Sequence, residues 1–117
     1  MAVKVLVADG DPTIRDGLIA ILETQPDFAA VGEAGDGHQA VEMARGLRPD
    51  VVLMDMGMPN LGGIEATRRI KQESPSTRVI ILTTYPSHVT EAFAAGASRY
   101  LLKDSPTPEL MRAIRGQ

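Results

Sequence analysis

Five short apolar runs, rich in β-branched residues, recur along the chain and limit its fold more than any other feature. Four of them are continuous rather than alternating, which is typical of strands buried on both faces of a parallel sheet. The second run, which begins at Phe28, is weaker and suits an edge strand. The runs occupy residues 3–8, 28–34, 51–54, 79–83 and 100–103.

Segments with helical spacing lie between and after these runs. The first begins at Asp11-Pro12, which joins an N-cap residue to a proline at the first helical position. A β-α unit repeated five times implies right-handed crossovers and an α/β doubly wound fold, in which helices cover both faces of a parallel sheet. The predicted helical segments carry apolar faces at Ile14, Leu18, Ile21 and Leu22; Ala40, Val41 and Ala44; Ile64, Ala66, Thr67 and Ile70; residues 88–95; and residues 108–114.

Composition narrows the class of protein. The 117 residues suit a single domain, and the absence of cysteine excludes disulfides and thiolate metal sites. The chain has 12 basic and 15 acidic residues, and its net charge of -3 disfavours direct binding to nucleic acid. No apolar run approaches the roughly 18 residues of a membrane span. We expect a soluble cytoplasmic domain with no direct contact to nucleic acid or membrane.

Polar residues stand at the carboxyl ends of four of the predicted strands: Asp9, Asp55, Thr83 and Lys103. Each has an ordinary structural explanation, because Asp often caps helices or forms turns and Thr is common in strands. However, the carboxyl ends of parallel strands meet at one edge, where ligands bind in sheets of this kind. The coincidence of all four favours a functional site.

This set of side chains suggests phosphoryl transfer onto a carboxylate. Two neighbouring carboxylates repel each other, and a divalent cation removes that penalty. Magnesium prefers oxygen ligands and keeps several of its waters. A carboxylate can attack phosphorus to form an acyl phosphate, whose oxygens require a metal, an ammonium and a hydroxyl donor. Asp55, Lys103 and Thr83 fit such a reaction.

The stretches VLVADGDP, VVLMDMGMP, VIILTT and AGASRYLLKD resemble a response-regulator receiver domain of two-component signalling, over essentially the whole chain. The stretches GEAGDG, EATRRI and AGASRYLLKDS are similar to the NarL/FixJ subgroup, whose receiver precedes a LuxR-type helix-turn-helix. The resemblance implies a flavodoxin-like (βα)5 fold with strand order 2-1-3-4-5. Residues 1–117 would form one receiver domain, and a C-terminal DNA-binding domain would lie outside this chain.

The resemblance also assigns roles to individual residues. It implies that Asp55 is the phosphoacceptor, Thr83 the switch hydroxyl and Lys103 the ammonium beside the phosphoryl group. Tyr100, three residues before the lysine, matches the aromatic switch position. A half-buried aromatic residue on an edge strand is the structural alternative for this tyrosine.

The implied magnesium site departs from the family pattern. Asp9 would hold Mg²⁺ largely through water, and the backbone carbonyl of Gly57 would be another ligand. The family's second acidic residue, which binds the metal directly, is replaced by Gly10, so we expect a weakened site. Asp11 is a surrogate ligand in one interpretation and the N-cap of the first helix in the other.

A second departure follows the fourth apolar run. Between Thr83 and Gly96 the chain is two residues shorter than the subgroup pattern, and Pro86 stands where a helix should begin. We therefore expect the helix at residues 88–95 to be short, tilted or late to start.

The resemblance implies a phosphorylation-dependent switch that accepts its phosphoryl group from a histidine kinase and controls a transcriptional output. Such a protein is not an enzyme, beyond catalysing its own phosphorylation and dephosphorylation. It would form a homodimer and reach DNA only through the missing C-terminal domain.

The alternative is a phosphorylation-independent interaction or ligand-binding module, in which Gly10 has removed a metal ligand. An FMN carrier or flavodoxin-like enzyme is disfavoured, because VADGDP offers carboxylates where hydroxyls would hold phosphate, and His38 and His88 are expected on the helical surface.

Overall fold

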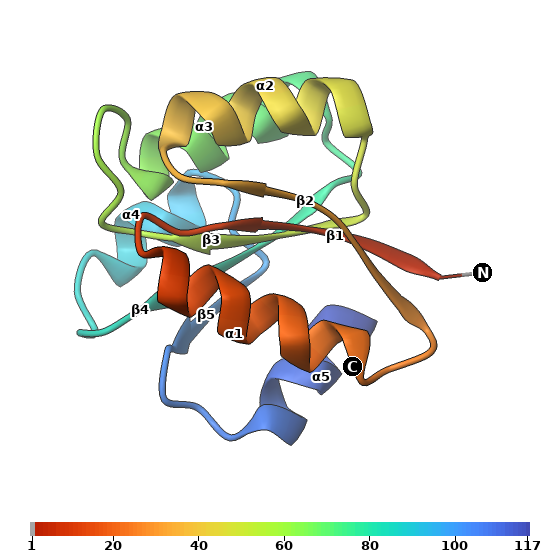
Figure 1. Cartoon of the computed structure of the whole chain (residues 1–117). Coiled ribbons are helices and arrows are strands. Elements are labelled where there is room, and N and C mark those ends of the chain that lie inside the picture. Colours follow the sequence, from red (N-terminus) through yellow and green to blue (C-terminus); the bar gives the residue numbers. More distant parts are fainter. Residues whose placement is uncertain (1) are drawn as a thin grey trace.

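The sheet of the computed structural model, which describes residues 2–117, is parallel and five-stranded in the order β2-β1-β3-β4-β5 (Figure 1). This confirms the predicted α/β fold and strand order. All five apolar runs form strands, with shifts of one residue at the ends of three of them. The strands are β1 (Val3–Ala8), β2 (Phe28–Ala34), β3 (Val51–Asp55), β4 (Arg78–Thr83) and β5 (Arg99–Leu102).

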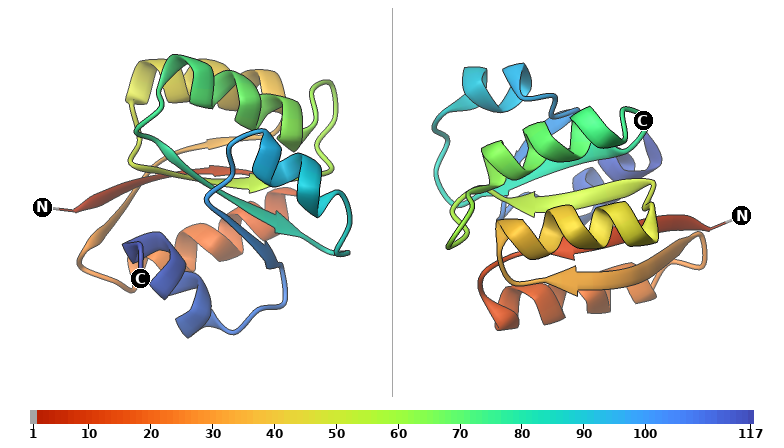
Figure 2. Two further views of the ribbon diagram at one scale, coloured as in Figure 1. Left: turned by 180° about the vertical axis from the view of Figure 1, so that it is seen from behind. Right: turned by 90° about the horizontal axis from the view of Figure 1, so that it is seen from above.

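Helices cover both faces of the sheet, as the two views of Figure 2 show. One face packs against α1 and α5, and the other against α2, α3 and α4. No helix among residues 2–117 has the length and apolar composition needed to cross a bilayer. The helices are α1 (Pro12–Glu23), α2 (Gly37–Leu47), α3 (Gly63–Glu73), α4 (Val89–Ala94) and α5 (Thr107–Arg115).

The central strands contribute to two separate cores because successive side chains point to opposite faces. In β3, Val51 and Leu53 join the core beneath α1 and α5, whereas Val52 and Met54 join the core beneath α2, α3 and α4. All four of these side chains are 1% exposed or less. Continuous apolar runs are therefore the signature of strands buried on both faces, as predicted.

The prediction was correct for one edge strand of the sheet and wrong for the other. β2 lies at an edge, as its weak run predicted. The run at 100–103 was interpreted as buried on both faces, but β5 occupies the other edge and only Leu101 of this strand is buried. Its second face is partly open because α4, which should cover it, has only six residues.

The start of α4 explains its length. His88 caps the helix in the left-handed conformation, with φ of 55° and no side-chain hydrogen bond, so the helix begins only at Val89. The expectation of a short, late fourth helix is confirmed. The N-terminus of α1 differs, since the Asp11 side chain accepts a hydrogen bond from Thr13 N at 2.9 Å.

Candidate functional site

Three of the predicted site residues meet at the carboxyl edge of the sheet. The ammonium nitrogen of Lys103 lies 2.8 Å from Asp9 Oδ2 and 3.1 Å from Asp55 Oδ1. One cation therefore joins the ends of the neighbouring strands β1 and β3 to the end of β5, which β4 separates from β3. The ammonium group thus bridges the two carboxylates.

Alternation along the strands explains why these side chains face one another. Asp55 follows Leu53 by two positions, so it projects toward the α1/α5 side, and Asp9 stands in the same relation to Val7. Lys103, just beyond the end of β5, likewise follows Leu101 by two. Because the three charged residues continue the same alternate positions along their strands, their side chains lie on the same side of the sheet edge.

The charges are sheltered from solvent to different degrees. The Asp9 side chain is 2% exposed, that of Asp55 14% and that of Lys103 18%. Burial alone would lower the pKa of Lys103, but its hydrogen bonds to Asp9 and Asp55 outweigh burial, so its pKa lies above the ordinary lysine value. The ammonium is therefore charged throughout the neutral pH range.

The carboxylates are also oriented by backbone amides. Asp11 N donates to Asp9 Oδ1 at 2.9 Å, and Gly57 N donates to Asp55 Oδ1 at 3.3 Å. Asp55 therefore has Oδ1 engaged by two donors, Lys103 and Gly57. Its second oxygen, Oδ2, makes neither of these contacts and is the one available to react.

A glycine at the start of α3 allows the helix to approach the strand that carries Asp55. A Cβ atom at Gly63 would stand 2.2 Å from the backbone oxygen of Asp55, so no other residue fits without moving the helix. Gly63 N also donates to Met56 O at 3.0 Å. The position of Asp55 thus depends on this glycine.

Thr83 and Tyr100 both hold the loop between β4 and α4. The Thr83 hydroxyl donates to Tyr85 O at 3.0 Å. The Tyr100 hydroxyl accepts from Ser87 N at 2.7 Å and donates to Ser87 O at 2.6 Å. Tyr100 also packs against the core beneath α2, α3 and α4. The two predicted switch residues are therefore connected through one loop.

A cleft of about 700 Å³ opens beside Asp55 and extends along the β4–α4 loop. His88 lies in this loop and lines the cleft, so placing it in a helix away from the strand ends was wrong. His38 is exposed on α2, as expected. Sequence patterns missed the cleft because its walls depend on loop conformation. It is lined by Asp55, Met56, Gly57, Gly62, Ile64, Glu65, Thr83, Thr84, Tyr85, Ser87, His88 and Lys103.

The oxygen atoms at the rim suit magnesium. Asp9 and Asp55 already share a cation, Lys103, and Gly57 follows Asp55 closely enough to add a backbone carbonyl. Such oxygen donors are those that Mg²⁺ prefers, with waters completing its shell. Within residues 2–117, no three acidic, His or Cys side chains gather as a metal site, so the side chains supply two carboxylates.

Asp11 contributes to this rim through its backbone, while its side chain caps α1. A metal-binding role for that side chain stays a prediction.

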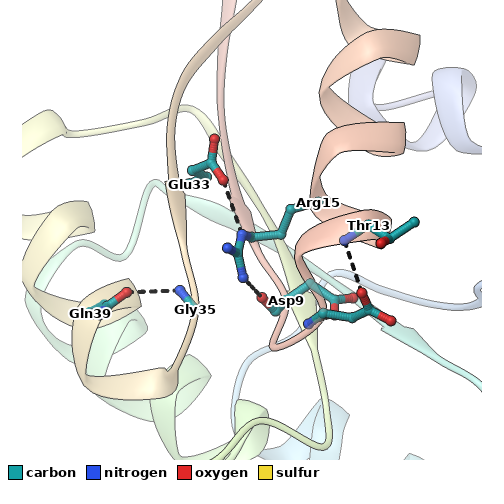
Figure 3. A network of polar contacts seen from close by, with 7 residues as sticks. Asp9, Thr13, Arg15, Glu33, Gly35 and Gln39 are labelled. Atoms are coloured by element: carbon teal, nitrogen blue, oxygen red, sulfur yellow. Dashed lines mark hydrogen bonds and ion pairs between the residues drawn. The ribbon is translucent and has the colours of Figure 1, made fainter.

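Arg15, which the sequence patterns did not single out, lies beside Asp9 and pairs with Glu33 (Figure 3). The available signal was a pair of opposite charges on α1 and β2, two elements adjacent in sequence.

Comparisons with known proteins agree with the fold. A family model described as the response regulator receiver domain matches residues 5–115. The transcriptional regulatory protein LiaR of Bacillus subtilis is 44% identical over 97% of this chain and 54% of its own length. The response regulator domain of Thermotoga maritima CheB is 38% identical with a TM-score of 0.92, covering 99% of this chain and 96% of that one.

A two-component response regulator of the LuxR family from Aurantimonas sp. SI85-9A1 is 37% identical with a TM-score of 0.93, covering 99% of this chain and 84% of that one. The chain spans about half the length of the curated relatives that it matches.

Proposed function

This chain belongs to the response regulator receiver domain family, and from that premise we propose that it accepts a phosphoryl group on Asp55 from a histidine kinase. The observation that carries the proposal is the Asp9–Lys103–Asp55 cluster, in which the ammonium stands 3.1 Å from Asp55 Oδ1. This cluster adjoins a cleft open to a phosphodonor. Receivers are signalling proteins rather than classical enzymes.

The proposed reaction uses the free oxygen of Asp55. Asp55 Oδ2 attacks the phosphorus of a phosphohistidine, and the phosphorus–nitrogen bond breaks. The electron pair leaves with the imidazole nitrogen, which takes up a proton, and an acyl phosphate remains on Asp55. Lys103 stabilises the negative charge of the transferring group from the side of Oδ1.

Receiver domains generally bind Mg²⁺, and we assign its ligands here to Asp9, Asp55 and the Gly57 carbonyl. The bound ion would neutralise the charge on the phosphoryl oxygens. Gly10 removes one carboxylate from this set, so we propose weaker metal binding than an aspartate at that position would provide.

The proposed switch passes through the β4–α4 loop. Movement of the Thr83 hydroxyl toward a phosphorylated Asp55 would break its bond to Tyr85 O. Because Tyr100 holds Ser87 two residues further on, a change in this loop would alter both Tyr100 and the start of α4. Phosphorylation would thus shift the population between two states of this surface.

The proposed output is transcription. LiaR and the other curated relatives named as transcriptional regulators are about twice the length of this chain, so DNA binding would belong to a segment outside it. Regulation of transcription would place the protein in the cytoplasm, and dimerisation stays a prediction. We do not adopt the phosphorylation-independent module, because the charged cluster forms despite Gly10.

The test is intact mass after incubation with acetyl phosphate, with and without Mg²⁺, beside Asp55→Asn as a control. The proposal predicts the gain of one phosphoryl group that needs Mg²⁺ and is absent in Asp55→Asn. A gain that persists in Asp55→Asn would reject Asp55 as the acceptor.

Two further variants test the weakened metal site. Gly10→Asp should raise the affinity for Mg²⁺ about 10- to 100-fold, and Gly10→Asn, which has the same size without the charge, should not. Equal affinities for Gly10→Asp and the wild type would contradict the weakening. Phosphorylation of Gly10→Asp alone would mean that the glycine has disarmed the receiver.

A further inference from the structure

The guanidinium group of Arg15 connects the ends of β1 and β2 through Asp9 and Glu33. Its NH1 nitrogen donates to Asp9 O at 2.7 Å, and its Nε donates to Glu33 Oε1 at 3.0 Å. Figure 3 shows the side chain reaching from α1 to both partners. The Arg15 side chain is only 18% exposed.

Asp9 needs a donor of this kind because it stands just outside the sheet. The pairing of β1 with both of its neighbours ends at Ala8, opposite Ala34 and Met54. Asp9 N still donates to Ala34 O at 3.0 Å, but the Asp9 carbonyl lies beyond the last pair of either ladder. Arg15 donates a hydrogen bond to this carbonyl, so the backbone stays held for one residue beyond the end of β1.

The anchored residue is the one before Gly10. Glycine has the widest backbone freedom of any residue, so the chain here would otherwise hold the Asp9 carboxylate loosely. The facing loop also carries a glycine, Gly35, and a Cβ atom built there would stand 3.4 Å from Nη1 of Arg15. Arg15 thus packs beside Gly35 and restrains the backbone of Asp9 through its hydrogen bond to Asp9 O.

We infer that Arg15 is a positioning residue, which fixes the backbone of Asp9 so that its carboxylate stays aligned with Lys103 and with a divalent cation. The inference rests on the proposed function for its link to phosphorylation. The hydrogen bonds of the Arg15 side chain go to the Asp9 backbone oxygen and to Glu33, and not to a carboxylate of Asp9 or Asp55, so it acts through the backbone of Asp9. The geometry requires two donors at a fixed angle, which a guanidinium provides and an ammonium does not.

The test uses Arg15→Met, which keeps the unbranched apolar stem of the side chain and removes both donors, and Arg15→Lys, which keeps the charge. Arg45→Met is the control, because it breaks another arginine–glutamate ion pair, Arg45–Glu73 at 2.7 Å between α2 and α3, away from the site. Four quantities are measured: the melting temperature, the Mg²⁺ dissociation constant, the initial rate of phosphorylation, and the NMR shift of the Asp11 amide. That amide donates to Asp9 Oδ1 and so reports where the carboxylate lies.

We expect Arg15→Met to weaken Mg²⁺ binding about 10-fold, to slow phosphorylation and to move the Asp11 amide signal. Arg15→Lys should recover part of each effect, and Arg45→Met should leave all three unchanged. A purely structural role would lower the melting temperature of Arg15→Met and Arg45→Met alike without moving the Asp11 signal, and that result would overturn the inference. If the wild type takes no phosphate, the proposed function fails, while the Asp11 signal still decides the role of Arg15.

Discussion

At the scale of the residue, Gly10 and Asp11 determine how well the rim can hold a cation. Gly10 does not adopt a left-handed backbone, so the turn itself does not require glycine. A Cβ at this position would meet Pro59 Cδ at 3.3 Å, a contact that a small shift relieves. An aspartate therefore fits at position 10. The backbone does not require glycine there, and the consequence of the glycine is that one carboxylate fewer is available to bind a metal.

We predict that Asp11→Asn leaves both stability and Mg²⁺ affinity at the wild-type level, because Asn caps helices as well as Asp does. Asp11→Ala should lower the free energy of unfolding by about 1 kcal/mol and leave Mg²⁺ affinity unchanged. Urea denaturation and Mg²⁺ titration of the two variants measure these effects. A loss of affinity in Asp11→Asn would instead show that the side chain leaves the cap to serve the metal.

At the scale of the element, α4 is short and only sparsely buried. It has six residues, of which only Ala92 is buried, whereas Val89 and Phe93 expose 41% and 48% of their surface. Few buried contacts mean a low free energy of local opening. The helix therefore depends on the loop before it, which Thr83 and Tyr100 hold by hydrogen bonds.

We predict that Tyr100→Phe loosens this loop, since it removes the partner of both Ser87 N and Ser87 O. The free energy of unfolding should fall by about 0.5–1.5 kcal/mol, and the Ser87 amide should exchange its hydrogen faster. Denaturation and amide hydrogen exchange measure the two effects. The control is Tyr85→Phe, which also loses a hydroxyl but from a residue 76% exposed. Unchanged exchange at Ser87 in Tyr100→Phe would contradict the account.

At the scale of the whole molecule, the sheet divides the interior into two cores that share the same strands. Leu22 of α1 belongs to the core beneath α1 and α5, and Ile70 of α3 to the core on the opposite face. Each of these side chains is 1% exposed. Because every central strand serves both cores, neither layer can unfold without exposing the other.

We predict that Leu22→Ala and Ile70→Ala each lower the free energy of unfolding by about 2–5 kcal/mol. Their effects should add to within about 0.5 kcal/mol in the double variant, because the two sites lie on opposite faces of the sheet. Denaturant unfolding followed by far-ultraviolet circular dichroism should show one transition throughout. Two separated transitions in either variant would mean that the faces are independent units.

The sequence by itself determined the order of the elements, the buried central strands and the weak edge at Phe28. These follow from local patterns: an apolar run of a given length forms a strand, and Asp11-Pro12 begins a helix wherever it stands. The convergence of Asp9, Asp55 and Lys103 was also predictable, because the carboxyl ends of parallel strands meet at one edge.

Only the tertiary structure decided which side chains touch within that edge. The contact of Arg15 with Glu33, that of Tyr100 with Ser87 and the position of His88 in the cleft depend on loop conformations and on which elements become neighbours. Periodicity fixes the face on which a side chain lies, but not its distance from a partner on another element. That distance is set by how the helices pack on the sheet, a property of the assembled chain rather than of any single segment.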